Sequence, residues 1–213
     1  MEGGTRTRYP ARILDEYDKN ATLRSYSSFK EREKRRMRKL LKPVTTVTLK
    51  EHTEKFIAKE RFIRSSFVAV LIYGFNANFR TLFLKGDGKI EYPPSAKGAN
   101  IVCYKLLRNS HDNRIVRRLG GEEKAETTLC CIHQLIEKEE KEKCGVLLID
   151  NRANIFYVRD IAGILRPVCV RRYSGGWYIA AGYFEDPSRW RKRNRVFSHN
   201  EIILEAQAPI ESE

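Results

Sequence analysis

The C-terminal part of the chain limits the possible folds most strongly, because it consists of short β-rich segments separated by turn-forming residues. These segments read GVLLID, NIFYVRD, ILRPVCVRRY, GWYIAAGYF and NRVFSH, between residues 145 and 199. β-branched and aromatic residues fill them, and Asn, Gly, Ser and Pro lie between them, which is typical of strands joined by turns. Short turns join antiparallel strands. We therefore predict an antiparallel β-meander here.

A strong helix signal comes immediately before the meander. Ala125, Leu129, Ile132 and Ile136 recur at helical spacing, and the charged segment EKEEKEK follows them. A sheet with an apolar face needs helices to cover it, so we predict an α+β fold with mixed or antiparallel sheets. For the earlier part of the chain we predict strands over 44–49 and 66–75, a hairpin over 80–92, and helices over 50–63 and 95–119.

The sequence predicts one α+β domain over residues 27–200. Residues 1–26 have little apolar periodicity and are predicted to form a flexible arm. Residues 201–213 contain four acidic and no basic residues, and they form an acidic C-terminal tail. Among internal positions, Gly120-Gly121 is the best candidate for a subdivision.

Composition limits the class of protein further. The chain has no run of about 18 apolar residues, the length that a membrane-spanning helix needs, and its first 20 residues do not resemble a secretory signal. We therefore predict an intracellular protein, cytoplasmic or located in the nucleus or nucleoid. Five cysteines without a C-x-x-C pair indicate free thiols rather than a disulfide framework or a zinc site. We predict no metal site and no cofactor.

The positive charge of the chain is unevenly distributed. The net charge is +14; residues 1–42 carry 13 basic and 6 acidic residues, and residues 151–200 carry 10 basic and 3 acidic residues. Basic residues gathered on a surface bind phosphates, because each neutralised phosphate releases condensed counterions. This distribution favours a nucleic acid or another polyanion as the partner.

The first basic block predicts a helix over residues 27–42, SSFKEREKRRMRKLLK. A serine can cap its N-terminus, acidic residues precede basic ones, and Pro43 ends the run. The opposite face has too few apolar residues for membrane binding, so we favour nucleic acid, with a localisation signal as an alternative. The residues predicted to share the basic face are Arg35, Arg38, Lys39 and Lys42.

The second block contains residues 189–195, RWRKRNR. In a strand its four arginines would share one face, where they would repel one another unless anions lay along them. A neighbouring tryptophan offers a stacking surface for a base. The alternative is that Trp190 anchors the end of the sheet, with the arginines solvated or paired with Glu185 and Asp186. The predicted nucleic-acid-binding residues of this block are Arg171, Arg172, Arg189, Trp190, Arg191, Lys192, Arg193 and Arg195.

These features predict a nucleic-acid-binding protein. RNA is favoured over DNA because Tyr173, Trp177, Tyr178 and Trp190 are mixed with the basic residues, and aromatic stacking is common at single-stranded RNA sites. Two alternatives stay open. One is a nuclease on the same basic surface, and the other is a basic module that docks an acidic protein.

Catalytic residues are not assigned by the sequence. Residues 85–88, KGDG, share the spelling of the adenylated-lysine motif of nucleic-acid ligases, but a hairpin turn also explains them and no later motif of those families follows. Asp87, Glu91 and Asp150 with Lys89 are candidates for metal-dependent cleavage, although turns favour aspartate in any case.

Metal-free cleavage of RNA would need a pair of histidines, for which His111 and His199 are the candidates. The sequence contains no P-loop, G-x-S-x-G, H-E-x-x-H or dinucleotide-binding glycine motif. The commonest enzyme classes are therefore disfavoured, and a non-enzymatic binder is preferred.

Overall fold

The computed structural model describes residues 40–51, 54–63, 72–85, 90–92 and 99–199. The predicted arm, most of the basic helix and the acidic tail lie outside the described residues, and so do both proposed domain boundaries. The domain limits at residues 27 and 200 therefore stay predictions. The described residues all belong to the unit that begins at Leu40.

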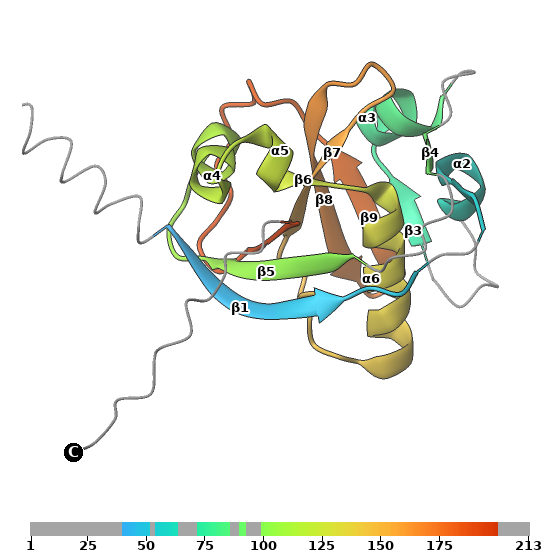
Figure 1. Cartoon of the computed structure of the whole chain (residues 1–213), viewed down its shortest axis with the longest axis horizontal. Coiled ribbons are helices and arrows are strands. Elements are labelled where there is room, and N and C mark those ends of the chain that lie inside the picture. Colours follow the sequence, from blue (N-terminus) through green and yellow to red (C-terminus); the bar gives the residue numbers. More distant parts are fainter. Residues whose placement is uncertain (1–39, 52–53, 64–71, 86–89, 93–98, 200–213) are drawn as a thin grey trace, which may run out of the picture. The chain divides into compact units, whose positions relative to one another are not determined.

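A mixed sheet of eight strands dominates this unit, with the order β1-β5-β10-β7-β8-β9-β3 and with β6 beside β7 (Figure 1). Its strands are β1 (Leu41–Thr48), β3 (Ile72–Phe75), β5 (Asn100–Leu106), β6 (Glu126–Thr127), β7 (Asn154–Arg159), β8 (Leu165–Tyr173), β9 (Gly176–Ala181) and β10 (Arg195–Ser198). A second sheet pairs β2 (Phe56–Ile57) with β4 (Glu91–Tyr92). The helical elements are α2 (Ala58–Arg61), α3 (Ala77–Phe79), the π-helical turn η1 (Arg80–Leu84), α4 (Asp112–Leu119), α5 (Glu122–Ala125) and α6 (Leu129–Glu142). The predicted α+β class is confirmed.

The helix predicted before the meander is α6. Thr128 caps its N-terminus, because the hydroxyl oxygen accepts a hydrogen bond from the backbone N–H of Cys131 at 3.1 Å. Leu129, Ile132 and Leu135 are buried in the cluster that lies between the helix and the sheet. The position and the sheet-covering role of this helix agree with the pattern of its apolar residues.

Strands β7, β8 and β9 form the predicted antiparallel meander, with Asn154 opposite Val170 and Val170 opposite Ile179. The last strand, β10, is placed differently. It lies between β5 and β7, antiparallel to β5 and parallel to β7. Residues 182–194 form a connection long enough to return the chain past the meander, so the rule that short turns join neighbouring strands does not apply to β10.

The segment predicted as the first strand of the meander, residues 145–150, is a loop. The buried carboxylate of Glu139 accepts hydrogen bonds from the backbone N–H groups of Gly145 (3.1 Å), Val146 (3.0 Å) and Leu147 (3.1 Å). These donors are consequently not free to join a ladder of strands. Val146, Leu147 and Leu148 are buried although the segment is not a strand, whereas Ile149 is exposed.

The helix predicted over residues 95–119 is wrong in its first half, where the chain forms β5. Cys103 belongs to one buried cluster and Tyr104 to the other, so apolar residues occupy both faces of the strand. This arrangement hides the two-residue period of the strand in the sequence. The second half of the predicted helix is present as α4, which begins just after the predicted break at Ser110.

Two further predictions for the first half of the chain are wrong. The first arm of the predicted hairpin is helical, because Asn76 caps α3 by accepting a hydrogen bond from the N–H of Phe79 at 2.8 Å, and η1 follows. The helix predicted over 50–63 is limited to α2, and β2 precedes it. The predicted turn at residues 86–89 lies outside the described residues.

Two buried clusters cover the two faces of the sheet. The larger one includes α6, and the smaller one includes Ile115, Val116 and Leu119 of α4. Phe156 of β7 and Phe197 of β10 are fully buried in the larger cluster, and their rings stack with centroids 4.5 Å apart. This contact joins β10 to the meander.

Because the Phe156 ring is fully buried, we expect Phe156→Ala to lower the free energy of unfolding by about 3–5 kcal/mol. Phe156→Leu keeps most of the volume and is expected to cost less than half as much. Urea denaturation of both variants measures the difference. A loss below about 1 kcal/mol for the alanine variant would show that β10 is not held by this stack.

Candidate functional site

Two loops meet at one end of the sheet, where β5 ends and β10 begins. Ser110 and Trp190 form a β-bridge, with both N–H···O distances near 3 Å. The backbone N–H of Lys192 donates to the Asn109 side-chain oxygen at 2.8 Å, and the N–H of Arg193 donates to the Leu106 carbonyl at 2.7 Å. The loop over residues 107–111 and the loop over residues 189–194 are thereby fixed to each other and to β5.

Asp112 links these loops to the core. Its carboxylate is 5% exposed, and one oxygen accepts hydrogen bonds from the Tyr157 hydroxyl at 2.8 Å and from the Trp190 indole N–H at 2.6 Å. Burial raises the pKa of Asp112, while the two hydrogen bonds act in the opposite direction. Trp190 therefore anchors the end of the sheet, as the alternative interpretation of this residue expected.

Basic side chains project from both loops. Arg108, Arg191, Lys192 and Arg193 are exposed and form no ion pair with another described residue. Arg189 is also exposed, and its Nε donates a hydrogen bond to His111 Nε2 at 3.0 Å. Four of these five residues belong to one short loop, so positive charge is concentrated on a rigid support.

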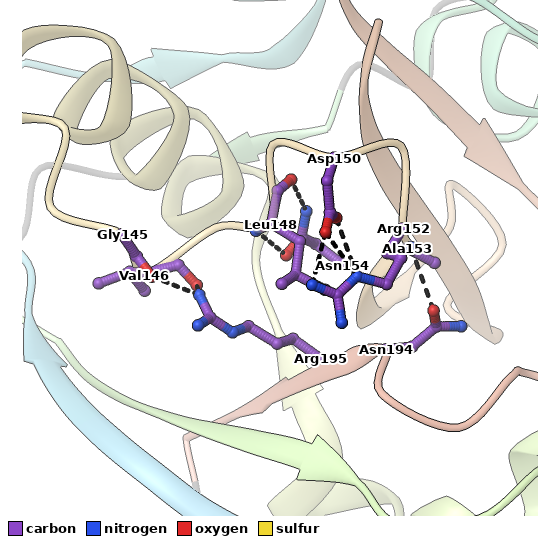
Figure 2. Close-up of polar contacts among 9 residues, drawn as sticks. All are labelled: Gly145, Val146, Leu148, Asp150, Arg152, Ala153, Asn154, Asn194 and Arg195. Carbon is purple, nitrogen blue, oxygen red and sulfur yellow. Dashed lines mark hydrogen bonds and ion pairs between the residues drawn. The ribbon is translucent and has the colours of Figure 1, made fainter.

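Three more basic residues lie in one row across the sheet. Lys42 of β1 is opposite Lys105 of β5, and Lys105 is opposite Arg195 of β10. Directly opposite residues point to the same side of a sheet, so the three side chains are neighbours. The guanidinium group of Arg195 donates to the carbonyl oxygens of Gly145 and Val146, so it is held close to the loop that Glu139 organises (Figure 2). We call the whole group the basic surface, which consists of Lys42, Lys105, Arg108, Arg189, Arg191, Lys192, Arg193 and Arg195.

The neighbouring loop is tightly bonded within itself. Asn154 exchanges hydrogen bonds with the backbone of Leu148, Arg152 binds Asp150, and the Asn194 side chain accepts a hydrogen bond from the N–H of Ala153 at 3.3 Å (Figure 2). Asp150 therefore has a cationic partner, which lowers its pKa. This loop supports the basic surface and offers no free carboxylate for a metal ion.

The predicted sharing of one face by four arginines is wrong, because residues 189–194 are not a strand. Arg193 has a left-handed backbone with φ of 76°, and the alternation of side chains between the two faces of a strand begins only at Arg195, where β10 starts. Arg172 is directed elsewhere, since it pairs with Glu140 at 3.3 Å and lies over the ring of Trp177. Arg171 points to the opposite face of β8 from Arg172. The predicted residues Arg35, Arg38 and Lys39 lie outside the described residues.

The two tryptophans do not serve as stacking surfaces in the predicted way. Trp177 is fully buried, and its indole N–H donates to Glu140 at 2.6 Å. Trp190 is half-buried and packs against the smaller cluster. Their indole N–H groups therefore satisfy internal carboxylates, as is usual for buried tryptophan.

Sequence reasoning missed Lys105 and Arg108, because it placed both residues in a helix. The structure identifies them by the register of β5, which puts Lys105 opposite Lys42 and Arg195 and puts Arg108 just after the strand. Four of the five cysteines are buried and all five are free thiols, as predicted.

The residues considered for catalysis do not converge. His199 contacts the Glu126 carbonyl at 2.8 Å and the Cys131 sulfur at 3.5 Å, whereas His111 contacts Arg189. Asp87 and Lys89 lie outside the described residues. Within the described part of the chain, no three His, Cys, Asp or Glu side chains are grouped so that they could hold a metal ion.

A scan of protein-family models, a search of curated proteins and a search of solved structures each found no match for this chain. Its function is therefore argued from its own residues alone. Among the described helices, none is both long enough and apolar enough to cross a membrane.

The Asp112 carboxylate satisfies two buried donors, so its removal has a predictable cost. We expect Asp112→Ala to lower the free energy of unfolding by about 2–4 kcal/mol, because an unsatisfied buried donor costs roughly 1–3 kcal/mol. Asp112→Asn keeps an acceptor oxygen, so we expect it to lower the free energy of unfolding less than Asp112→Ala does. Urea denaturation at pH 7 compares the two variants, and an equal loss in both would mean that the hydrogen bonds are not the cause.

The raised pKa of Asp112 also predicts a pH dependence. Between this raised pKa and the ordinary value of about 3.9, the folded state binds a proton that the unfolded state does not, so stability rises as the pH falls. Asp112→Asn lacks this contribution. We expect the stability advantage of the wild type over Asp112→Asn to increase from pH 7 to pH 4 in urea denaturation. An advantage that is constant or smaller at pH 4 would contradict a raised pKa.

Proposed function

We propose that this protein binds nucleic acid through the basic surface. The supporting observation is that Arg108, Arg191, Lys192 and Arg193 are exposed on two loops that hydrogen bonds fix to the sheet, with no acidic partner among the described residues. Phosphate groups are the natural partners of such side chains, because arginine can donate two parallel hydrogen bonds to one phosphate.

The proposed mechanism is electrostatic capture of the phosphate backbone. Fixed cations lose little conformational freedom on binding, so more of the electrostatic attraction is available for affinity. Such contacts carry no sequence information by themselves. The basic segment that ends at Lys39 is joined directly to Leu40, whose carbonyl accepts a hydrogen bond from Leu107 at this same end of the sheet. The predicted phosphate contacts of Arg35, Arg38 and Lys39 stay a prediction from the sequence.

RNA stays our first choice over DNA, although the two tryptophans no longer support it. An acidic protein is the other partner that a basic surface can bind. The two are distinguished by competition, since short oligonucleotides displace only a nucleic-acid ligand from this surface. A nuclease is less well supported, because the candidate histidines contact different parts of the protein.

The central test is a double charge reversal, Arg191→Glu with Lys192→Glu. Both side chains are exposed and form no hydrogen bond or ion pair with another described residue, and the backbone hydrogen bond from residue 192 is kept. We expect affinity for single-stranded and duplex RNA and DNA to fall about tenfold or more near 0.1 M salt, with a salt dependence less steep by roughly 0.7–0.9 per lost contact. Fluorescence anisotropy at several salt concentrations measures both quantities.

The matched control is Lys59→Glu with Lys141→Glu, which changes the net charge equally on the exposed sides of α2 and α6. An equal loss of affinity in both double variants would show that net charge, rather than the basic surface, causes binding. The same samples, incubated with and without Mg²⁺ and run on a gel, show whether the strands are cut. Cut strands would favour the nuclease alternative.

A further inference from the structure

Three tyrosines lie on β3, β8 and β9, the strands nearest to the edge of the sheet that is opposite to β1. Tyr73 is 51% exposed, Tyr173 is 38% exposed and Tyr178 is half-buried. The rings of Tyr173 and Tyr178 meet edge to face, with centroids 6.0 Å apart. None of the three belongs to either buried cluster. We call Tyr73, Tyr173 and Tyr178 the tyrosine face.

One glycine allows a tyrosine ring to approach the backbone closely. A Cβ atom at Gly175 would stand 2.9 Å from Cδ2 of Tyr73, which is closer than real side chains approach. At Gly74 a Cβ atom would lie 3.6 Å from the ring of Tyr178, which is an ordinary contact. The absence of a side chain at Gly175 is therefore what makes room for the Tyr73 ring.

The tyrosine face and the basic surface belong to the same end of the sheet. Arg195 of β10 is opposite Asn154 of β7, and Asn154 is opposite Val170 of β8. The next residue of β8 is Arg171, which is opposite Tyr178 of β9. Consecutive residues of a strand point to opposite faces, so Arg171 and Tyr178 lie on the other face of the sheet from Arg195. The two groups share the end of the sheet, where three steps of about 4.8 Å, roughly 15 Å, separate β10 from β9.

Arg171 supplies positive charge beside the tyrosines. Its side chain is half-buried, its Nη1 donates to the Asn151 carbonyl at 3.4 Å and its Nε to the Cys169 sulfur at 3.4 Å, and no carboxylate of another described residue forms an ion pair with it. A face of aromatic rings next to a guanidinium whose charge is not neutralised by a described carboxylate is chemically matched to a ligand that has both flat π surfaces and negative charge. Nucleic acid has both features.

We propose that the tyrosine face stacks unpaired nucleobases, so that this protein binds single-stranded in preference to duplex nucleic acid. The proposal rests on the function proposed above, with the cations of the loop over residues 189–194, at the same end of the sheet, holding the phosphates of the same strand. Bases inside a duplex already stack on one another, and only unpaired bases offer their faces to a protein. Stacking accepts every base, so this preference is for strand type and not for sequence.

The test replaces the two most exposed rings, as Tyr73→Ala with Tyr173→Ala. The probes are a fluorescein-labelled oligouridylate of 12 nucleotides, a 12-base-pair RNA duplex, and an abasic strand of the same length. We expect the double variant to bind the oligouridylate about tenfold or more weakly, since stacking on one aromatic side chain is worth about five- to 150-fold in affinity. Binding of the duplex and of the abasic strand is expected to stay the same.

Two control variants show whether a loss of affinity for the oligouridylate is caused by the missing aromatic rings. Tyr73→Phe with Tyr173→Phe keeps the rings and is expected to keep wild-type affinity. Tyr183→Ala removes an exposed ring that lies after the end of β9, beside Arg166, and is expected to have no effect. Far-UV circular dichroism and urea denaturation verify that all variants are folded.

The outcomes separate this inference from the proposed function. If Arg191→Glu with Lys192→Glu weakens binding while the tyrosine-to-alanine variant binds the oligouridylate normally, the basic surface stands and the stacking role is wrong. If the wild type binds none of the probes, both proposals are wrong. Sedimentation that shows a wild-type dimer, lost in the alanine variant, would assign the tyrosine face to a second copy of this chain and overturn the inference.

Discussion

The buried carboxylate of Asp112 is the interaction on which the basic surface depends. One oxygen binds both Tyr157, in the first strand of the meander, and Trp190, in the loop before β10. The loops carry many like charges, which repel one another, so the chain needs an internal restraint to keep them together. A carboxylate between two neutral donors provides this restraint without neutralising any of the surface cations. The carboxylate that holds the loops is thus buried, and the basic side chains of the loops stay exposed.

The internal acids of this protein act in a common way. Glu139 organises the loop after α6 through three backbone N–H groups, and Glu140 receives the indole N–H of Trp177. In each case the carboxylate satisfies donors that burial would otherwise leave without a partner. Because Asp112 and Glu139 are buried, they do not offset cations at the surface.

The sequence was sufficient where a pattern was local and was insufficient where distant segments decided the outcome. The helix α6 and the strands β7, β8 and β9 of the predicted meander were predicted correctly because their periods and turns lie within the segments themselves. β5 was not, because a strand that is apolar on both faces has no visible alternation, and its neighbours β1 and β10 lie far away in the chain. Trp190 shows the same limit at the site. The basic residues around Trp190 in the sequence suggested that it stacks on a base. Instead, its hydrogen bond to Asp112, almost eighty positions earlier, makes it an anchor for the loop before β10.

The central position of β10 has a consequence for the order of events during folding. This strand is the last described one along the chain, yet it fills the gap between β5 and β7, so neither neighbour completes its ladder until β10 arrives. Contacts between such distant segments make folding slow, because a large loop must close before they form. A nascent chain that has not yet produced residues 189–198 also lacks five of the eight residues of the basic surface. This part of the proposed binding site would thus form only once the sheet is complete.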